Sequence, residues 1–363
     1  MGDNQKEKPA GLIFMTSSET IISTKDLEIG FKAHRAAKPA KIVARNVNVA
    51  LKGGQVVCLL GPNGSGKSTL IKTLAGLHPP LDGTIKFSER NLSQFTIESL
   101  ARKISTVLTD RITIGNLSVY ELVSFGRSPY TGWYGSLTQE DISIIEWAIK
   151  ATGIEQFVDR DVLHLSDGER QKVMIARALA QDTSAILLDE PTAHLDLPNR
   201  VEIIRLLRTL SHKTRKGILL STHELDLALK AADQLWLINM EGQVFTGIPE
   251  DLVLDGTFES VFEQDSFEFD RATGSFTIHR PSSSPVCLSG DDIAMFWTRR
   301  AIEREGYNVS QSYDAKLHIE AIKGVDGFEW NLSNGESEIS CSSVRELIRG
   351  LNVLARKVVN DRN

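Results

Sequence analysis

Residues 61–69 have the sequence Gly61-Pro62-Asn63-Gly64-Ser65-Gly66-Lys67-Ser68-Thr69 and follow the apolar run Gln55-Val56-Val57-Cys58-Leu59-Leu60. The nonapeptide matches the pattern G-x-x-x-x-G-K-[ST] without a departure. An apolar run directly before it is typical of a strand that is buried on both faces of a parallel sheet. Together the two segments predict a phosphate-binding loop between a buried strand and a helix that begins near Lys67.

The residue types in this loop suit the phosphate tail of a nucleoside triphosphate. Gly61, Gly64 and Gly66 allow the chain to curl until successive backbone N–H groups point into one concavity. Lys67 would place a cation on the β and γ phosphates, and the hydroxyl of Ser68 could ligate Mg²⁺. The alternative is a glycine-rich turn without a ligand, but the strand before the loop and the Lys-Ser pair argue against it.

The bulk properties limit the classes of protein that fit. The chain has 363 residues and a formal net charge of -6, so we expect a main body and a smaller unit, with no affinity for nucleic acid. Cys58, Cys287 and Cys341 have neither zinc nor disulfide spacing. No apolar stretch reaches transmembrane length and the start of the chain is too polar for a secretory signal, which predicts a cytoplasmic location.

The segments around the loop have the periodicity of strands and a helix. Residues 1–19 are expected to form a flexible tail. Thr20 to Phe31 is predicted to be an edge strand that ends in an aromatic residue, and Asn46 to Leu51 alternates with a period of two, which predicts a second strand. A helix is predicted after the loop, from Leu70 to Gly76.

Residues 91–165 are predicted to form a helical insertion. Helices are expected from Val119 to Phe125 and after Thr138, where Thr138 and Asp141 resemble a capping box. The loop between them contains Tyr130, Trp133 and Tyr134. These aromatic residues either pack the core of the insertion or form a surface for a partner, and the sequence leaves both interpretations open.

Further polar residues follow two more buried strands. The strand Ala185 to Leu188 ends in Asp189-Glu190, and the strand Ile218 to Ser221 ends in Thr222-His223-Glu224. An open α/β sheet binds ligands at the carboxyl ends of its strands. We therefore expect these side chains to lie near the phosphate-binding loop.

Five segments, taken in order, resemble the ATP-binding subunit of ABC transporters: the phosphate-binding loop, residues 165–169, residues 186–190, residues 193–196 and His223. The resemblance covers about Thr20 to Arg280. It implies an α/β fold with a P-loop NTPase sheet and a helical insertion. It also implies a homodimer in which two subunits enclose two ATP molecules, each site joining the phosphate-binding loop of one chain to the signature helix of the other.

The resemblance also implies a role for each matched residue. Glu190 would be the general base, with Lys67 and His223 as further catalytic residues that contact phosphate; Asp189 would hold Mg²⁺ together with Ser68. Nucleotide-binding residues would be Gly61, Pro62, Asn63, Gly64, Ser65, Gly66, Lys67, Ser68, Thr69, the adenine-stacking Phe31, and Ser166, Gly168 and Asp196 at the dimer interface.

The chain departs from the family pattern in two places. The signature is commonly Leu-Ser-Gly-Gly-Gln, whereas this chain has Asp167 and Glu169 within it. A carboxylate beside a phosphate is unfavourable, so we expect both side chains to turn back along their own helix, leaving Ser166 and Gly168 to face the ATP of the partner. Where the family carries a glutamine near the metal, this chain has Thr109 and Asp110. Thr109 is too short to span the same gap, so either a water molecule bridges it to the metal or Asp110 takes the place of the glutamine.

The last part of the chain lies beyond the resemblance. Residues 281–285 are expected to be a linker, and residues 286–363 a small α+β domain. Strands are predicted at 286–288, 307–309, 316–322, 328–332 and 338–341, and helices at 291–305 and 343–357. Asn334-Gly335 predicts a hairpin turn.

The segment from Val119 to Tyr130 is most similar to ATPases that import iron-siderophores, haem or cobalamin. The resemblance therefore implies a peripheral subunit at the inner face of the membrane that moves a separate integral membrane permease and, indirectly, serves a substrate-binding protein. Two alternatives are a soluble ABC-type ATPase that acts on a ribosome or DNA, and a nucleotide-gated regulatory protein without turnover. A basic patch, a heptad repeat or a second phosphate-binding loop would favour the soluble ATPase, and none is found in the sequence.

Overall fold

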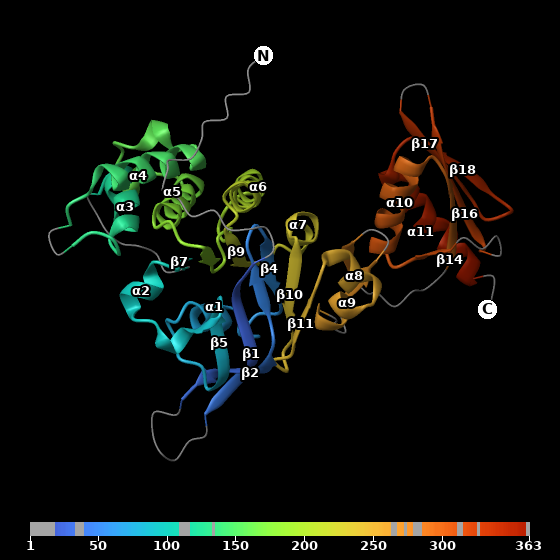
Figure 1. Ribbon diagram of the computed structural model, residues 1–363. Helices are drawn as coiled ribbons and strands as arrows, with labels where there is room; N and C mark the ends of the chain where they lie inside the picture. Colours follow the sequence, from blue (N-terminus) through green and yellow to red (C-terminus); the bar gives the residue numbers. More distant parts are fainter. Residues whose placement is uncertain are drawn as a thin grey trace. The chain divides into compact units, whose positions relative to one another are not determined.

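The computed structural model describes residues 19–32, 40–108, 117–132, 135–262, 267–271, 274–278, 285–310, 315–324 and 327–360. Its contacts divide the chain into two compact units, residues 1–262 and 263–363 (Figure 1). This division falls before the expected boundary at residue 280, because the hairpin of β12 (Phe267–Asp270) and β13 (Ser275–Ile278) belongs to the second unit. Several predictions fall on residues outside the described ranges: residues 1–18 of the expected tail, Thr109, Asp110, Trp133 and Tyr134.

The first unit is built around a six-stranded sheet with the order β11-β10-β4-β9-β8-β7. Its strands are parallel except for β11 at one edge. All residues of β4, β8 and β9 are buried, as expected for strands that are covered on both faces. The bounds are β4 (Val56–Leu60), β7 (Ile104–Val107), β8 (Ala185–Leu188), β9 (Gly217–Ser221), β10 (Gln234–Ile238) and β11 (Val244–Gly247).

A second, antiparallel sheet has the order β2-β1-β5-β6, with β3 also paired to β1. The strand from Thr20 to Phe31 is present, but its prediction as an edge strand was wrong, because β1 pairs with β2 and β3 on one side and with β5 on the other. The bounds are β1 (Thr20–Phe31), β2 (Lys41–Val47), β3 (Ala50–Lys52), β5 (Asp82–Phe87) and β6 (Arg90–Asn91).

The predicted single strand from Asn46 to Leu51 was also wrong, since the chain forms two strands there. Asn46 has a left-handed backbone with φ of 52°, and β2 ends at the next residue. The side chain of Asn48 accepts a hydrogen bond from the backbone N–H of Asp26 at 2.9 Å. The amide nitrogen of Asn48 also donates to the carbonyl oxygen of Asn46 at 3.0 Å. Such side-chain hydrogen bonds to the backbone compete with the sheet pattern between β2 and β3.

Helices cover both faces of the parallel sheet. On one face, α1 (Lys67–Leu74) lies in an apolar cluster with residues of both sheets. On the other face lies α6 (Leu197–Thr214), which contacts β4 and β9 but contributes no residue to that cluster. The short helix α7 (Leu225–Ala231) also contacts β4. The phosphate-binding loop is thus held between a buried strand and a buried helix.

The expected helical insertion contains α3 (Val119–Ser124) and α4 (Gln139–Thr152), which pack against α5 (Asp167–Ala180) and lie beside the sheet in Figure 1. Thr138 caps α4 in a capping box with Asp141, as predicted. Shorter helices are α2 (Ile97–Ala101), and, at the end of the unit, α8 (Pro249–Leu254) and α9 (Thr257–Phe262). Short 3-10 turns cover Leu92–Gln94, Phe125–Arg127, Glu155–Phe157 and Val162–His164.

The second unit has its own apolar core between a five-stranded sheet and two helices, and each predicted strand and helix is present to within a few residues. The sheet order is β15-β14-β16-β17-β18, and Asn334 accepts hydrogen bonds from the N–H groups of Glu336 and Ser337 in the predicted hairpin turn. The bounds are β14 (Pro285–Gly290), α10 (Asp292–Arg304), β15 (Asn308–Ser310), β16 (Leu317–Lys323), β17 (Phe328–Ser333), β18 (Glu338–Cys341) and α11 (Val344–Asn360).

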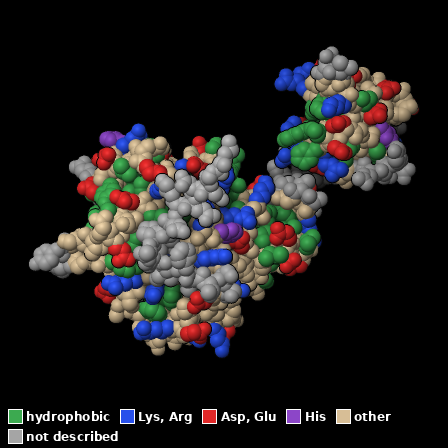
Figure 2. Space-filling view, turned by 45° about the horizontal axis from the view of Figure 1, so that its top comes forward, with side chains coloured by type: hydrophobic (Ala, Val, Ile, Leu, Met, Phe, Trp, Pro, Cys, Tyr) green, Lys and Arg blue, Asp and Glu red, His purple; other side chains and the backbone are tan. Residues whose placement is uncertain are grey.

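The surface of the second unit is mixed in character. Figure 2 shows apolar side chains among charged ones on the visible face of this unit. Ile293, Phe296 and Trp297 on α10 are exposed, and the guanidinium of Arg300 lies 5.5 Å from the ring centroids of both Phe296 and Trp297. Among the helices that the structure describes, none is long and apolar enough to cross a membrane.

Candidate nucleotide-binding site

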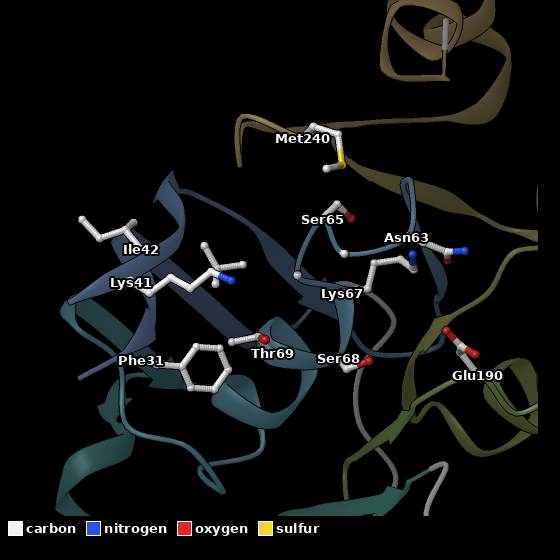
Figure 3. A pocket seen from close by; sticks show the side chains of 13 residues that line it. Phe31, Lys41, Ile42, Asn63, Ser65, Lys67, Ser68, Thr69, Glu190 and Met240 are labelled. Atoms are coloured by element: carbon white, nitrogen blue, oxygen red, sulfur yellow. The ribbon is translucent and has the colours of Figure 1, made fainter. Parts of the chain in front are cut away.

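A cleft of 480 Å³ lies between the phosphate-binding loop and the ends of β1 and β2 (Figure 3). One end has an aromatic and apolar lining and the other has the loop. Glu190 lies beside the loop end, and Met240 reaches the cleft from the turn between β10 and β11. The lining residues are Phe31, Lys41, Ile42, Val43, Asn63, Gly64, Ser65, Gly66, Lys67, Ser68, Thr69, Glu190 and Met240.

The loop has the conformation that its glycines predict. Gly66 precedes α1 with φ of 107°, and a Cβ atom there would lie 2.1 Å from Cγ1 of Val43. Only glycine is compatible with this approach. Lys67 is buried, and its ammonium donates to the carbonyl oxygens of Gly61 at 2.8 Å and Pro62 at 3.0 Å. Burial lowers the pKa of Lys67, while the carboxylates of Glu190 and Asp189 oppose that shift.

Ser68 and the carboxylates after β8 form one hydrogen-bonded group. The hydroxyl of Ser68 donates to Oδ1 of Asp189 at 3.0 Å, and the hydroxyl of Ser221 at the end of β9 donates to the same oxygen at 2.7 Å. The backbone N–H of Glu190 donates to the hydroxyl of Ser221 at 2.9 Å. The ends of neighbouring parallel strands therefore bring the predicted metal-binding and catalytic residues together.

Glu190 has an unusual backbone and a close partner. Its φ is 51°, a left-handed conformation that costs a non-glycine residue on the order of 1–3 kcal/mol and is concentrated at functional sites. Oε1 of Glu190 lies 2.6 Å from Nε2 of His223. Both side chains are partly exposed, His223 at 43% and Glu190 at 28%, so a water molecule can reach the carboxylate.

Phe31 lies at the other end of the cleft, and its role in stacking on adenine stays a prediction. Phe31 is 49% exposed, and its ring packs against the ring of His78, with 5.2 Å between the centroids. Nε2 of His78 in turn lies 2.7 Å from the carbonyl oxygen of Gly30. One face of an exposed aromatic ring that is held from behind is available for stacking on a flat ligand.

The signature residues begin α5. Glu169 receives hydrogen bonds from the backbone N–H and the hydroxyl of Ser166, both at 2.8 Å, which lower the pKa of Glu169. Asp167 accepts from the guanidinium of Arg170 at 3.2 Å. Both carboxylates are thus engaged within their own helix, as predicted, and Gly168 is buried beside the side chain of Asn199.

Other predicted residues lie apart from the cleft. Ser166, Gly168 and Asp196 are not among the described residues that line it, and their predicted place at the site of a second chain stays a prediction. Asp196 is exposed and caps α6, accepting from the N–H of Asn199 at 3.1 Å. Thr109 and Asp110, the predicted neighbours of the metal, lie outside the described residues and stay predictions.

The loop after α3 is tied to the insertion by a buried arginine. Nε of Arg127 donates to Oδ1 of Asp141 on α4 at 2.7 Å, and NH1 donates to the carbonyl oxygen of Ala180 at 2.9 Å. The guanidinium lies 3.9 Å from the ring centroid of Tyr130, and that of Arg102 lies 5.0 Å from it. Tyr130 is thus half-buried between two arginines, while Trp133 and Tyr134 lie outside the described residues, so both interpretations of these aromatic residues stay open.

Comparison with known proteins places this architecture in a family. Residues 44–193 match the ABC transporter family model, and residues 283–352 match the model of the iron ABC transporter C-terminal domain. An uncharacterized ABC transporter ATP-binding protein of Methanocaldococcus jannaschii is 33% identical over 258 residues, which are 71% of this chain and 87% of that protein. The chain belongs to the family of ABC transporter ATP-binding proteins. It is an ABC-type ATPase with a P-loop NTPase sheet.

Further relatives have more specific names. The iron(3+)-hydroxamate import ATP-binding protein of Bacillus subtilis is 30% identical over 74% of this chain and 95% of its own. The cobalamin import ATP-binding protein of Halobacterium salinarum is 34% identical over 64% of this chain and 58% of its own. Among solved structures, a dimeric bacterial ABC transporter cassette is 26% identical and has a TM-score of 0.55, covering 63% of this chain and 99% of its own.

Proposed function

We propose that this chain is the ATP-hydrolysing motor subunit of an importer that drives uptake of an iron-siderophore, haem or cobalamin through a separate membrane permease. The observation that carries the proposal is the pairing of two features in one chain. The cleft joins the phosphate-binding loop to Glu190, and the second unit matches the iron ABC transporter C-terminal domain. The names of the hydroxamate and cobalamin relatives support the same substrate classes.

The two ends of the cleft suit the two parts of an ATP molecule. The triphosphate would lie against the N–H groups of the loop and the ammonium of Lys67, and the adenine would stack on Phe31. The oxygens of Ser68 and Asp189 are hard donors that lie 3.0 Å apart, and such donors suit Mg²⁺ with water and phosphate completing its shell. Bound Mg²⁺ would supply charge neutralisation on the transferred phosphoryl group.

Hydrolysis requires a base beside the γ-phosphate. Glu190 lines the loop end of the cleft, and its carboxylate would orient and polarise the attacking water. His223 lies within hydrogen-bond distance of this carboxylate and would hold it in place while its imidazole contacts the γ-phosphate. Glu190 follows β8 with a left-handed backbone and lines the cleft.

The residues outside the cleft suit a homodimer with two shared sites. Ser166 and Gly168 lie at the amino end of α5, where N–H groups and the helix dipole favour an anion. With Asp167 and Glu169 turned back, this end can face the ATP of a second copy. Asp196 would lie at the same interface. The dimer would close on two ATP molecules and open after hydrolysis, and these movements would drive the permease. A substrate-binding protein would deliver the substrate to the permease.

The test is affinity purification of the full chain from solubilised membranes of cells that encode it, followed by mass spectrometry. The proposal predicts that a protein with several membrane spans co-purifies with the chain in an amount comparable to it. Recovery of the chain with ribosomal or DNA-bound proteins, and without a membrane protein, would instead favour the soluble ATPase.

A further inference from the structure

The cleft contains a second lysine that no sequence motif identifies. Lys41 begins β2 and lies directly opposite Phe31 in the antiparallel pairing of β1 with β2. Residues opposite each other in such a pair lie on the same face, with Cβ atoms about 5 Å apart. Lys41 and Phe31 both line the cleft, and in Figure 3 the side chain of Lys41 extends between Phe31 and the loop.

The backbone around Lys41 is held in a fixed position. A Cβ atom on Gly30 would lie 2.1 Å from the carbonyl oxygen of Lys41, so only glycine permits this approach of the two strands. His78 contacts the carbonyl oxygen of the same Gly30 at 2.7 Å. The end of the cleft that Phe31 lines and the start of β2 are therefore packed together in fixed positions. The side chain of Lys41 itself is exposed.

The two lysines of the cleft differ in their partners. Lys67 is buried and donates to two loop carbonyl oxygens. Lys41 forms no ion pair with any residue that the structure describes. An exposed, unpaired lysine is usually only a solvated side chain. Here, however, it lies beside the stacking ring and along the path between that ring and the phosphate-binding loop, where the phosphate nearest the ribose must lie.

We propose that Lys41 binds the α-phosphate of the nucleotide, a role separate from that of Lys67 at the β and γ phosphates. The proposal rests on nucleotide binding in this cleft. It implies that Lys41 strengthens binding of every nucleotide with an α-phosphate by a similar factor. It also implies that Lys41 does not discriminate between ATP and ADP.

The experiment compares the full chain with its Lys41→Met variant, which keeps the apolar stem and removes the charge. Equilibrium binding of ATP, ADP, AMP and adenosine is measured by calorimetry or by displacement of a fluorescent nucleotide. The affinities for ATP, ADP and AMP should each fall about five- to twentyfold, because an exposed charged contact with phosphate is lost. The affinity for adenosine should stay the same, and Lys41→Arg should restore most of the binding.

Two further variants make the result decisive. Lys25→Met removes an exposed lysine of β1 that does not line the cleft and should bind nucleotides like the unmodified chain. If Lys41→Met binds ATP and ADP within twofold of the unmodified chain, or loses affinity for ATP alone, the role of Lys41 is refuted. If Lys67→Ala also leaves ATP binding unchanged, the nucleotide lies elsewhere, and the assignment of the cleft fails rather than that of Lys41.

Discussion

At the scale of single residues, the most informative side chain is Glu190. Its backbone is strained, its N–H is held by Ser221 and its carboxylate is held by His223. Each of these features fixes the carboxylate at the loop end of the cleft. A structural carboxylate at a strand end would more simply cap the following helix, but the next long helix, α6, is capped by Asp196.

Replacing Glu190 by Gln should therefore remove catalysis without removing nucleotide binding. We expect ATP turnover to fall by about 10²- to 10⁴-fold, the usual contribution of a general base, while ATP affinity changes by less than about threefold. Phosphate release and equilibrium binding measure the two effects. The matched control is Glu146→Gln at an exposed position of α4, which should keep full turnover. Undiminished hydrolysis by Glu190→Gln would show that another group activates the water.

Sequence motifs identified the polar end of the site but not its apolar wall. The phosphate-binding loop is one contiguous pattern, and Asp189, Glu190 and His223 were predicted because each follows the end of a buried strand. By contrast, Lys41, Ile42, Val43 and Met240 come from β2 and from the turn between β10 and β11. Their contribution depends on how two sheets approach one another, and no local pattern in the sequence records that approach.

At the scale of secondary-structure elements, the first turn of α5 explains the acidic signature. The capping box of Ser166 and Glu169 and the ion pair of Asp167 with Arg170 keep both carboxylates on the chain that carries them. A carboxylate in the first turn also interacts favourably with the helix dipole. The acidic residues can thus replace the usual glycine and glutamine without placing charge against the phosphate of a partner.

The corresponding prediction concerns Asp167→Gly. Because the Asp167 side chain is 60% exposed and paired with Arg170, its removal should change ATP-driven dimerisation by less than about fivefold. Sedimentation or light scattering with ATP in the hydrolysis-deficient Glu190→Gln background measures the dimer. Asp226→Gly on α7, which removes the exposed partner of Lys230, is the control. A rise in dimer affinity by orders of magnitude would place the carboxylate against the phosphate.

A second element-scale feature is the buried ion pair between Arg127 and Asp141, whose side chains are 6% and 7% exposed. Burial opposes ionisation of Asp141, but hydrogen bonds from Thr138 and Arg127 outweigh it and lower the pKa. A lowered carboxyl pKa stabilises the fold above the unfolded-state value, and this stability is lost as the pH falls through the folded-state pKa. The helical insertion should therefore loosen in acid.

We expect Asp141→Asn to destabilise the insertion by about 3–5 kcal/mol at pH 7, because it leaves Arg127 buried without its partner. The difference from the unmodified chain should shrink below about pH 4, as the pH falls from the unfolded-state pKa of an aspartate toward the lowered pKa of folded Asp141. Hydrogen exchange of the α4 amides measures the local stability. The exposed ion pair of Asp226 with Lys230 offers the control. The variant Asp226→Asn should change the free energy of unfolding by less than about 1 kcal/mol. Equal exchange rates in all three chains at pH 7 would contradict this account.

Element types were predictable where one period dominated the sequence. The helix after Thr138 follows from its capping box, and the buried strands follow from short apolar runs. The errors occurred in β1 and in residues 46–51. Whether β1 has one neighbour or two depends on pairing with β5, about sixty residues away in the chain. The break after Val47 coincides with a hydrogen bond between Asn48 and Asp26, which is also distant in the sequence.

At the scale of the whole molecule, two independently packed units share one chain. The first contains the cleft beside the phosphate-binding loop and the second has a separate apolar core. Sequence periodicity predicted the elements of the second unit because each has an amphipathic pattern. It did not reveal that residues 267–278 form a hairpin that belongs with this unit, because this pairing depends on contacts distant in the sequence. The match to the iron ABC transporter C-terminal domain links this unit to the proposed cargo.

The central claim is that ATP hydrolysis in this chain drives import of an iron chelate, haem or cobalamin. The most direct measurement is accumulation of radiolabelled ferric siderophore, haem and cobalamin in cells that lack the encoding gene and carry either the unmodified chain or Glu190→Gln at equal amounts. The account predicts that at least one of these compounds accumulates with the unmodified chain and falls to the level of the deletion strain with Glu190→Gln. Equal accumulation of every compound in all three strains would contradict it.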